Sequence, residues 1–298
     1  MRAPMRSLAI LSIGMVLASG AVAGPAPKGH LVLIGGGEKP ADAMAKFIEL
    51  AGGPEAPMIA IPTASKDDDV ATYYTTLFRE KYGCPNMVTL DIKSKADAMR
   101  EDWADLARQA GGIFFGGGDQ IRITNALLDT PVGNAIATAY ARGAVIGGTS
   151  AGTACQSRIM ITGEGDFTVI RANSVETWRG LGLFRDVVVD QHFIARQRSN
   201  RLLTVILEHP ELLGVGVDEG TAVWVRPDGT FQVLGKSCVM VVDAKRATVS
   251  RRASETGQDS LGVHDLKVHV LLPGEEFDIK ARKVIRGGHA AGPSPVRP

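Results

Sequence analysis

Short runs of apolar residues recur along much of the chain, and most of them are continuous rather than alternating. They are Leu31–Ile34, Met58–Ile61, Met87–Leu90, Gly112–Phe115, Ala144–Ile146, Val187–Val189 and Leu213–Val217. Continuous runs are typical of strands that are buried on both faces, because helices then cover both sides of the sheet. This feature constrains the fold more than any other, and it predicts an α/β protein.

The stretch between the first two runs has the helical pattern that such a fold needs. Apolar residues recur at helical spacing over Met44–Ala51, Pro40 suits the first turn, and Gly52 suits the end. Strand, helix and strand in alternation predict a mostly parallel sheet with helices on both faces. The polar residues that end each strand should then meet at one edge, where open α/β sheets bind ligands.

The sequence becomes rich in strand patterns after about Thr221. Ala222–Val225 and Phe231–Leu234 flank a Pro-Asp-Gly turn, which predicts a hairpin. Further strands are expected at Val239–Val242, Lys267–Leu272 and Val284–Ile285. Because no linker marks a second domain, we expect one α/β domain over residues 24–286, with a β-rich C-terminal part.

Both ends of the chain are expected to lie outside this domain. Two arginines precede an apolar stretch over residues 8–17, and Ala21-Val22-Ala23 provides small residues for a signal peptidase. The pattern predicts a signal peptide over residues 1–23 and a secreted or periplasmic protein; an uncleaved anchor helix is the alternative. Residues 287–298 are rich in Gly and Pro and are expected to be disordered.

Composition argues against several classes of partner. The 298 residues carry a formal net charge of +1 without a polybasic tract, so neither nucleic acid nor, after signal cleavage, a membrane is an expected partner. The segment Gly35-x-Gly37-x-x-Pro40 departs from the dinucleotide fingerprint at its last position, so no cofactor is expected. The three cysteines lack the close spacing of a zinc site, so no metal is expected, and which pair would form a disulfide stays open. They are Cys84, Cys155 and Cys238.

The segment Gly148-Thr149-Ser150-Ala151-Gly152 fits the small-x-Ser-x-small pattern of a nucleophile elbow. An apolar run precedes it, and a helix is expected to follow. Small residues are needed there because the chain turns sharply and holds the serine in a strained conformation with its hydroxyl exposed. The alternative is a glycine-rich turn that binds phosphate. Ser150 is therefore the candidate nucleophile.

A nucleophilic serine needs a base, and His192 directly follows an apolar run at the expected edge of the sheet. Glu219 follows the next run and is the candidate for the acid that orients this base. Asp218 is the alternative, although neighbouring residues of a strand point to opposite faces. The order Ser150, His192, Glu219 counts against an α/β-hydrolase, in which the histidine comes last.

Hydrolysis through a serine also needs backbone amides that stabilise negative charge. Ala151, directly after the serine, and Gly118, at the end of a run of three glycines, are expected to form this oxyanion hole. Arg196, Arg198 and Arg201 closely follow the candidate base, and their forked guanidinium groups suit a carboxylate. A solvated basic surface is the alternative for this cluster.

Together these residues resemble the serine peptidase family that includes cyanophycinase and dipeptidase E. The matching segments are Phe114–Gln120, Gly147–Gly152, Val189–Phe193 with the three arginines, and Val217–Ala222. The Asp-Gln-His-Phe block resembles the cyanophycinase side of the family, whereas Gly116 departs from the expected loop sequence. The fold of this family is similar to the flavodoxin-like fold of class I glutamine amidotransferases, with serine as the nucleophile.

The resemblance implies an exopeptidase that releases β-Asp-Arg dipeptides from cyanophycin, a poly-aspartate with arginine side groups, through an acyl-enzyme. It implies Ser150 as nucleophile, His192 as base and Glu219 as its partner, with Asp190 or another acid facing the substrate guanidinium. The matching substrate-pocket positions are Gln120, Asp190, Gln191, Arg196, Arg198 and Arg201. The expected partner is a polymeric or small isoaspartyl peptide, and a homodimer is possible. The alternatives are an isoaspartyl dipeptidase with another substrate and a non-catalytic amidotransferase-like binding protein.

Overall fold

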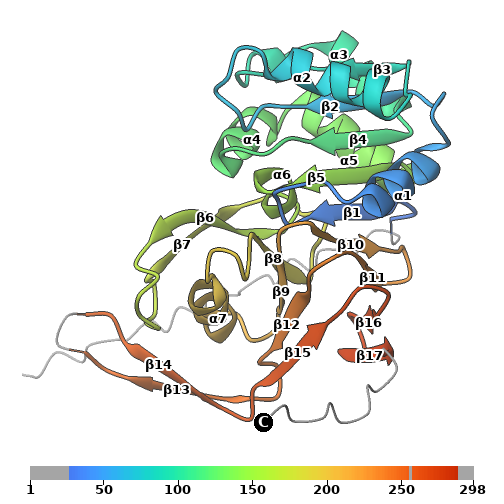
Figure 1. The fold of residues 1–298 in the computed structure, drawn as a ribbon. Helices are drawn as coiled ribbons and strands as arrows, with labels where there is room; N and C mark the ends of the chain where they lie inside the picture. The colour runs from blue at the N-terminus through green and yellow to red at the C-terminus, as the bar shows by residue number, and fades with distance from the viewer. Residues whose placement is uncertain (1–26, 255–256, 288–298) are drawn as a thin grey trace, which may run out of the picture.

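The computed structural model describes residues 27–254 and 257–287. The expected signal peptide, and all but the first residue of the expected disordered tail, lie outside these residues. A nine-stranded sheet with helices on both faces forms one part of the molecule, and a four-stranded sheet and two hairpins lie beside it (Figure 1).

The nine-stranded sheet has the strand order β17-β16-β11-β10-β1-β5-β4-β2-β3. Its parallel part consists of β1 (Leu31–Ile34), β2 (Met58–Ile61), β3 (Met87–Thr89), β4 (Gly112–Phe115) and β5 (Val145–Thr149). Its antiparallel part consists of β10 (Thr221–Val225), β11 (Thr230–Gly235), β16 (Glu276–Asp278) and β17 (Lys283–Arg286). The predicted α/β fold is confirmed, and so is the hairpin at the start of the β-rich part, since β10 and β11 pair in antiparallel fashion.

Helices cover both faces of the parallel part. They are α1 (Ala41–Ala51), α2 (Val70–Thr76), η1 (Leu77–Lys81), η2 (Asp97–Met99), α3 (Glu101–Gln109), α4 (Gln120–Leu127), α5 (Pro131–Arg142) and α6 (Ala151–Ala154), whereas α7 (Ser199–Glu208) packs against the second sheet described below. Alternate residues of β1 enter different cores: Leu31 and Leu33 pack with α3 and α5, whereas Val32 and Ile34 pack with α1 and α2. Burial on both faces explains the continuous apolar runs.

The helix expected after β1 forms where its terminal residues predict. α1 begins directly after Pro40 and ends at Gly52, whose φ of 107° is the left-handed conformation that glycine adopts without strain. Phe47 from its buried face meets Phe114 of β4 edge to face at 5.5 Å between ring centroids. These contacts anchor the segment Gly35–Lys39, which leads from β1 into α1 beside the candidate site.

Two of the runs expected in the main sheet belong to a second sheet instead. Its strands are β8 (Val187–Gln191), β9 (Leu213–Val217), β12 (Val239–Asp243) and β15 (Lys267–Leu271), in the order β15-β12-β9-β8. Both edges of β1 are occupied, one by β5 and the other by β10, and β8 and β9 pair with each other in parallel and extend through β12 to β15.

The chain after α6 forms a hairpin that the sequence patterns did not predict. It consists of β6 (Ile159–Gly165) and β7 (Val175–Arg179), and a second hairpin consists of β13 (Thr248–Arg252) and β14 (Ser260–His264). The three cysteines are free, so none of the possible disulfides forms. No helix among the described residues is long and apolar enough to cross a membrane.

Candidate active site

Ser150 lies at the sharp turn between β5 and α6. Its backbone has φ 54° and ψ −115°, a conformation that L-residues rarely adopt and that typifies a nucleophile elbow. Glycines on both sides make the turn possible: a Cβ on Gly148 would overlap the carbonyl of Gly152, and one on Gly152 would overlap the carbonyl of Phe115. The small residues of the motif are therefore required by backbone packing.

His192 and Glu219 form a hydrogen-bonded chain with this serine. Ser150 Oγ lies 2.9 Å from His192 Nε2, and His192 Nδ1 is bonded to Glu219 Oε1. His192 is held at the end of β8 with φ 49°, and its amide donates to the carbonyl of Gly35 at 2.6 Å. The structure thus brings together three residues that are far apart in the sequence.

Asp218 points away from the histidine, as alternation along the chain predicts. Its Oδ1 accepts hydrogen bonds from the amides of Ile194 and Ala195 at 3.0 and 2.9 Å, and its Oδ2 accepts one from the Ser237 hydroxyl at 2.7 Å. Burial by itself raises the pKa of Asp218, but these hydrogen bonds outweigh it and lower the pKa. Asp218 therefore holds the loop that follows His192, and Glu219 is left to orient the imidazole.

The glycine loop after β1 forms a floor beneath the histidine, a role that the sequence patterns did not reveal. A Cβ on Gly36, which has φ 115°, would overlap the imidazole ring of His192, and one on Gly37 would lie 3.2 Å from Glu219 Oε2. A Cβ on Gly35 would overlap the carbonyl of Asp218. Gly35, Gly36 and Gly37 do not belong to a dinucleotide-binding fingerprint. Glycine is required at these positions because a side chain there would overlap or crowd His192, Asp218 or Glu219.

Burial sets the protonation of the base. Desolvation is the largest effect and lowers the pKa of His192, and the positive charge of Arg196 lowers it further. The carboxylate of Glu219 opposes both effects. The imidazole is therefore neutral at neutral pH, with Nε2 free to accept a proton from Ser150 when Nδ1 donates to Glu219.

The amides proposed for an oxyanion hole lie on both sides of Ser150. Ala151 directly follows the serine, and the Gly116–Gly118 loop borders it from β4, with Gly117 positioned so that a Cβ would lie 3.4 Å from Ser150 Cβ. The Gly117 amide is bonded to the Tyr74 hydroxyl, and burial raises the pKa of that hydroxyl to about 12. Gly118, the next residue of this loop, stays the candidate for the second donor amide.

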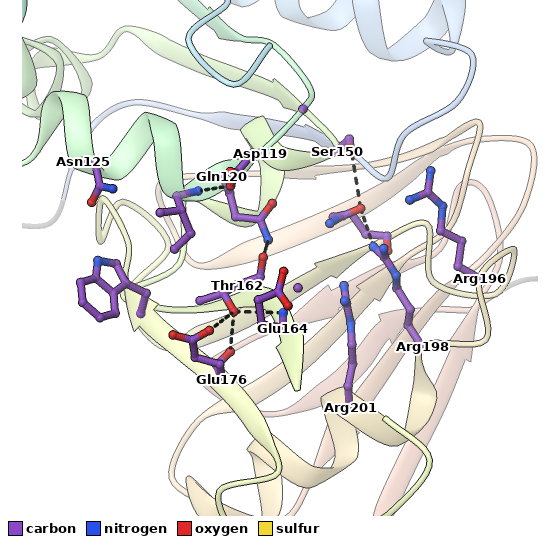
Figure 2. Close-up of a pocket in the computed structure, with 15 residues that line it drawn as sticks. Asp119, Gln120, Asn125, Ser150, Thr162, Glu164, Glu176, Arg196, Arg198 and Arg201 are labelled. Carbon is purple, nitrogen blue, oxygen red and sulfur yellow. Dashed lines mark hydrogen bonds between the residues drawn. The ribbon is translucent and has the colours of Figure 1, made fainter. Parts of the chain in front are cut away.

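A cavity of about 710 Å³ opens beside Ser150 (Figure 2). Its volume is within the range of roughly 300–1,000 Å³ that is usual for ligand sites. Seven of the residues that the sequence singled out line it, namely Gly118, Gln120, Ser150, Gln191, Arg196, Arg198 and Arg201. A second cavity of about 540 Å³ shares Ser150 with the first and also contains His192. The nucleophile therefore lies between two spaces that can receive the two sides of a scissile bond.

Asp190 does not line the cavity, which corrects its expected place in the substrate pocket. Its carboxylate is buried and forms a bidentate pair with Arg201, so it has no oxygen free for a substrate guanidinium. Arg198 donates to the carbonyl oxygen and to Oε1 of Gln191, both at 2.7 Å. Burial lowers the pKa of Arg198 to about 10, and the charge of Arg201 adds to this effect. Arg196 is exposed beside them.

Several cavity residues escaped the sequence analysis, chiefly those of the β6–β7 hairpin. The missed residues are Asp119, Ile121, Asn125, Thr162, Gly163, Glu164, Glu176 and Trp178. The glycines at 163 and 165 mark an irregular strand, but nothing in the local pattern indicates that its residues face Ser150. No group of three or more metal-ligating side chains occurs among residues 27–254 and 257–287.

Comparison with known proteins shows which family the chain belongs to. A family model described as peptidase family S51 matches residues 31–233. A cyanophycinase from Geminocystis herdmanii is 32% identical over 265 residues, which cover 87% of this chain and 97% of that protein. A cyanophycinase from Trichormus variabilis is 34% identical over 269 residues, covering 89% and 90%. The crystal structure of a peptidase from an acI-B1 actinobacterium has the same fold, with a TM-score of 0.64, 22% identity and coverage of 85% and 98%.

Proposed function

The chain belongs to peptidase family S51 and is a serine-type peptidase, and on that premise we propose that Ser150, His192 and Glu219 are its catalytic triad. The observation that carries the proposal is the 2.9 Å contact between Ser150 Oγ and His192 Nε2, with Glu219 on the other ring nitrogen. A non-catalytic binding protein would not need this alignment, nor the strained backbone of Ser150.

The proposed reaction follows from these contacts. His192 Nε2 takes the proton of the Ser150 hydroxyl while Oγ attacks the carbonyl carbon of the scissile amide. The amides of Gly118 and Ala151 stabilise the charge on the carbonyl oxygen, and Glu219 stabilises the imidazolium. His192 then protonates the leaving amine, which departs and leaves an ester on Ser150. Water, deprotonated by the same histidine, hydrolyses this ester and restores the enzyme.

We further propose that the substrate is cyanophycin, cleaved to β-Asp-Arg dipeptides. The relatives named cyanophycinase match nearly the whole chain, which supports this class of substrate. The main cavity also contains arginines that can face a carboxylate, as the aspartate units of such a polymer require. The alternative substrate is a simple isoaspartyl dipeptide. Export through residues 1–23 stays part of the proposal, because an exported enzyme would meet the polymer outside the cell.

The test is hydrolysis by the purified protein of cyanophycin and of an isoaspartyl dipeptide without arginine, followed by mass spectrometry of the products. Release of β-Asp-Arg, lost in Ser150→Ala and in His192→Ala, supports the proposal. The double variant should be barely slower than either single variant, because the two residues act as one unit. Cleavage of the simple dipeptide alone would move the assignment to an isoaspartyl dipeptidase, and wild-type rates in Ser150→Ala would disprove the triad.

A further inference from the structure

The main cavity has two chemically different walls (Figure 2). One wall carries Arg196 and Arg198, and the other is formed by the β6–β7 hairpin with Glu164 and Glu176. Trp178 of the same hairpin also lines the cavity and is 51% exposed. Asp190 was the acid expected to bind the cation of the substrate, but its carboxylate is already paired with Arg201. The β6–β7 hairpin carries two other carboxylates that line the cavity, one on each strand.

Glu164 and Glu176 are exposed, and neither forms a salt bridge with a cationic side chain in the described part of the chain. Thr162 Oγ1 lies 3.2 Å from Glu176 Oε2 and accepts a hydrogen bond from the Glu164 amide, also at 3.2 Å. The strand register shifts between Ile161 and Gly165, an irregularity of the kind that redirects side chains. The shift places Thr162 and Glu164 on the cavity rather than in a regular ladder.

Gln120 supplies an independent observation at the same wall. This side chain is 5% exposed, and its Nε2 donates to the carbonyls of Ile161 and Thr162 at 2.8 and 2.5 Å. Both partners are acceptors, so the amide nitrogen must face the strand and the amide oxygen must face the cavity. The bonds given for Gln120 use its nitrogen, so the amide oxygen can accept a hydrogen bond from a ligand in the cavity or from solvent.

We propose that Glu164, Glu176, Trp178 and the amide oxygen of Gln120 form a guanidinium-binding wall for the arginine of the substrate. A guanidinium is a planar cation with five N–H donors and no acceptor, and it stacks on aromatic rings. The wall offers the complementary set of carboxylate and amide acceptors with one exposed indole. The inference rests on the proposed function, because it requires a substrate that carries arginine next to the scissile bond.

Binding is tested in the Ser150→Ala background, which cannot turn over the ligand. The probes are the dipeptides β-Asp-Arg and β-Asp-citrulline, since citrulline replaces the guanidinium by a neutral urea of the same shape. Isothermal titration calorimetry should give at least about tenfold tighter binding of the arginine dipeptide, because the charged pairs are lost with citrulline. Glu164→Gln together with Glu176→Gln should remove this preference and leave binding of the citrulline dipeptide nearly unchanged.

Asp166→Asn is the matched control, because Asp166 is an exposed acid of the same hairpin that does not line the cavity. It should keep the full preference for arginine. Trp178→Leu should weaken binding of the arginine dipeptide by about threefold or more, since cation–π contacts of exposed rings have this size. Equal binding of the two dipeptides, or a preference that survives the double Glu→Gln variant, would overturn the proposal.

Hydrolysis separates this inference from the proposed function. Polymers with arginine and with citrulline side groups are given to the enzyme with Ser150 intact. If both are cleaved with the same kcat/KM, the proposed hydrolysis stands and the guanidinium-binding wall does not. If neither is cleaved while the Ser150→Ala variant prefers the arginine dipeptide through its glutamates, the wall stands and the proposed hydrolysis fails.

Discussion

The carboxylate of Asp190 and the guanidinium of Arg201 form a bidentate ion pair inside the protein, where Asp190 is 1% and Arg201 2% exposed. The pair joins β8 to α7 immediately before Gln191 and His192. It therefore fixes the backbone that delivers the candidate base to Ser150. This role differs from substrate contact, and it leads to a prediction about stability.

Asp190→Ala should lower the free energy of unfolding by about 3–5 kcal/mol, because it leaves the buried charge of Arg201 without a partner. Urea denaturation measures the change. The control is Arg179→Ala, which breaks the exposed bidentate pair of Arg179 with Asp129, both contacts at 3.1 Å. That loss should stay below about 1 kcal/mol, as is usual for exposed pairs. Equal effects of the two variants would show that burial of the first pair is unimportant.

Gly36→Ala should abolish most of the activity, because its new methyl group would displace the ring of His192 from Ser150. Gly53→Ala is the control: Gly53 also has positive φ, at 94°, but a Cβ there would contact nothing within 4 Å. Backbone strain should cost both variants about 1–3 kcal/mol of stability, and Gly36→Ala should lose more because its methyl group overlaps the imidazole. Only Gly36→Ala should lower kcat, by about 100-fold or more, as expected for a misplaced catalytic group. Normal kcat in Gly36→Ala would contradict the proposed contact.

Ser150→Gly should be more stable than Ser150→Ala by about 1–2 kcal/mol, although both variants are inactive. The reason is the backbone of Ser150, whose φ of 54° with ψ of −115° strains any residue with a Cβ. Differential scanning calorimetry or urea denaturation compares the pair. Equal stabilities would mean that the elbow is relaxed in solution.

The rate should fall as pH decreases through the pKa of His192, because the protonated ring cannot accept the serine proton. Arg196 lowers this pKa, so Arg196→Ala should raise it and move the acid limb of the kcat/KM profile to higher pH. Glu219 raises the pKa, so Glu219→Gln should move the limb to lower pH and also reduce the rate. Arg108→Ala, which removes an exposed charge on α3, serves as the control and should leave the limb in place. Shifts in the opposite directions would contradict the assignment of His192.

The sequence by itself determined the elements whose cause is local. β1, β2, β4 and β9 have the bounds that their apolar runs predict, because burial on both faces leaves a continuous pattern. The elbow around Ser150 could be recognised because the sharp turn requires small residues at positions 148 and 152, which lie within one five-residue segment. Positions at strand ends indicated His192 and Glu219, and the structure bonds His192 to the serine and Glu219 to His192.

Tertiary structure decided everything that depends on contacts between distant segments. No local pattern shows that Gly36 packs against the ring of His192 or that the β6–β7 hairpin forms a wall of the cavity. Nor does any local pattern show that the carboxylate of Asp190 binds Arg201 rather than a substrate. The same limit explains why β8 and β9 were expected in the main sheet: strand partners depend on which edges remain free once the other segments have packed. Sequence periodicity records which faces of an element are buried, but not which residues bury them.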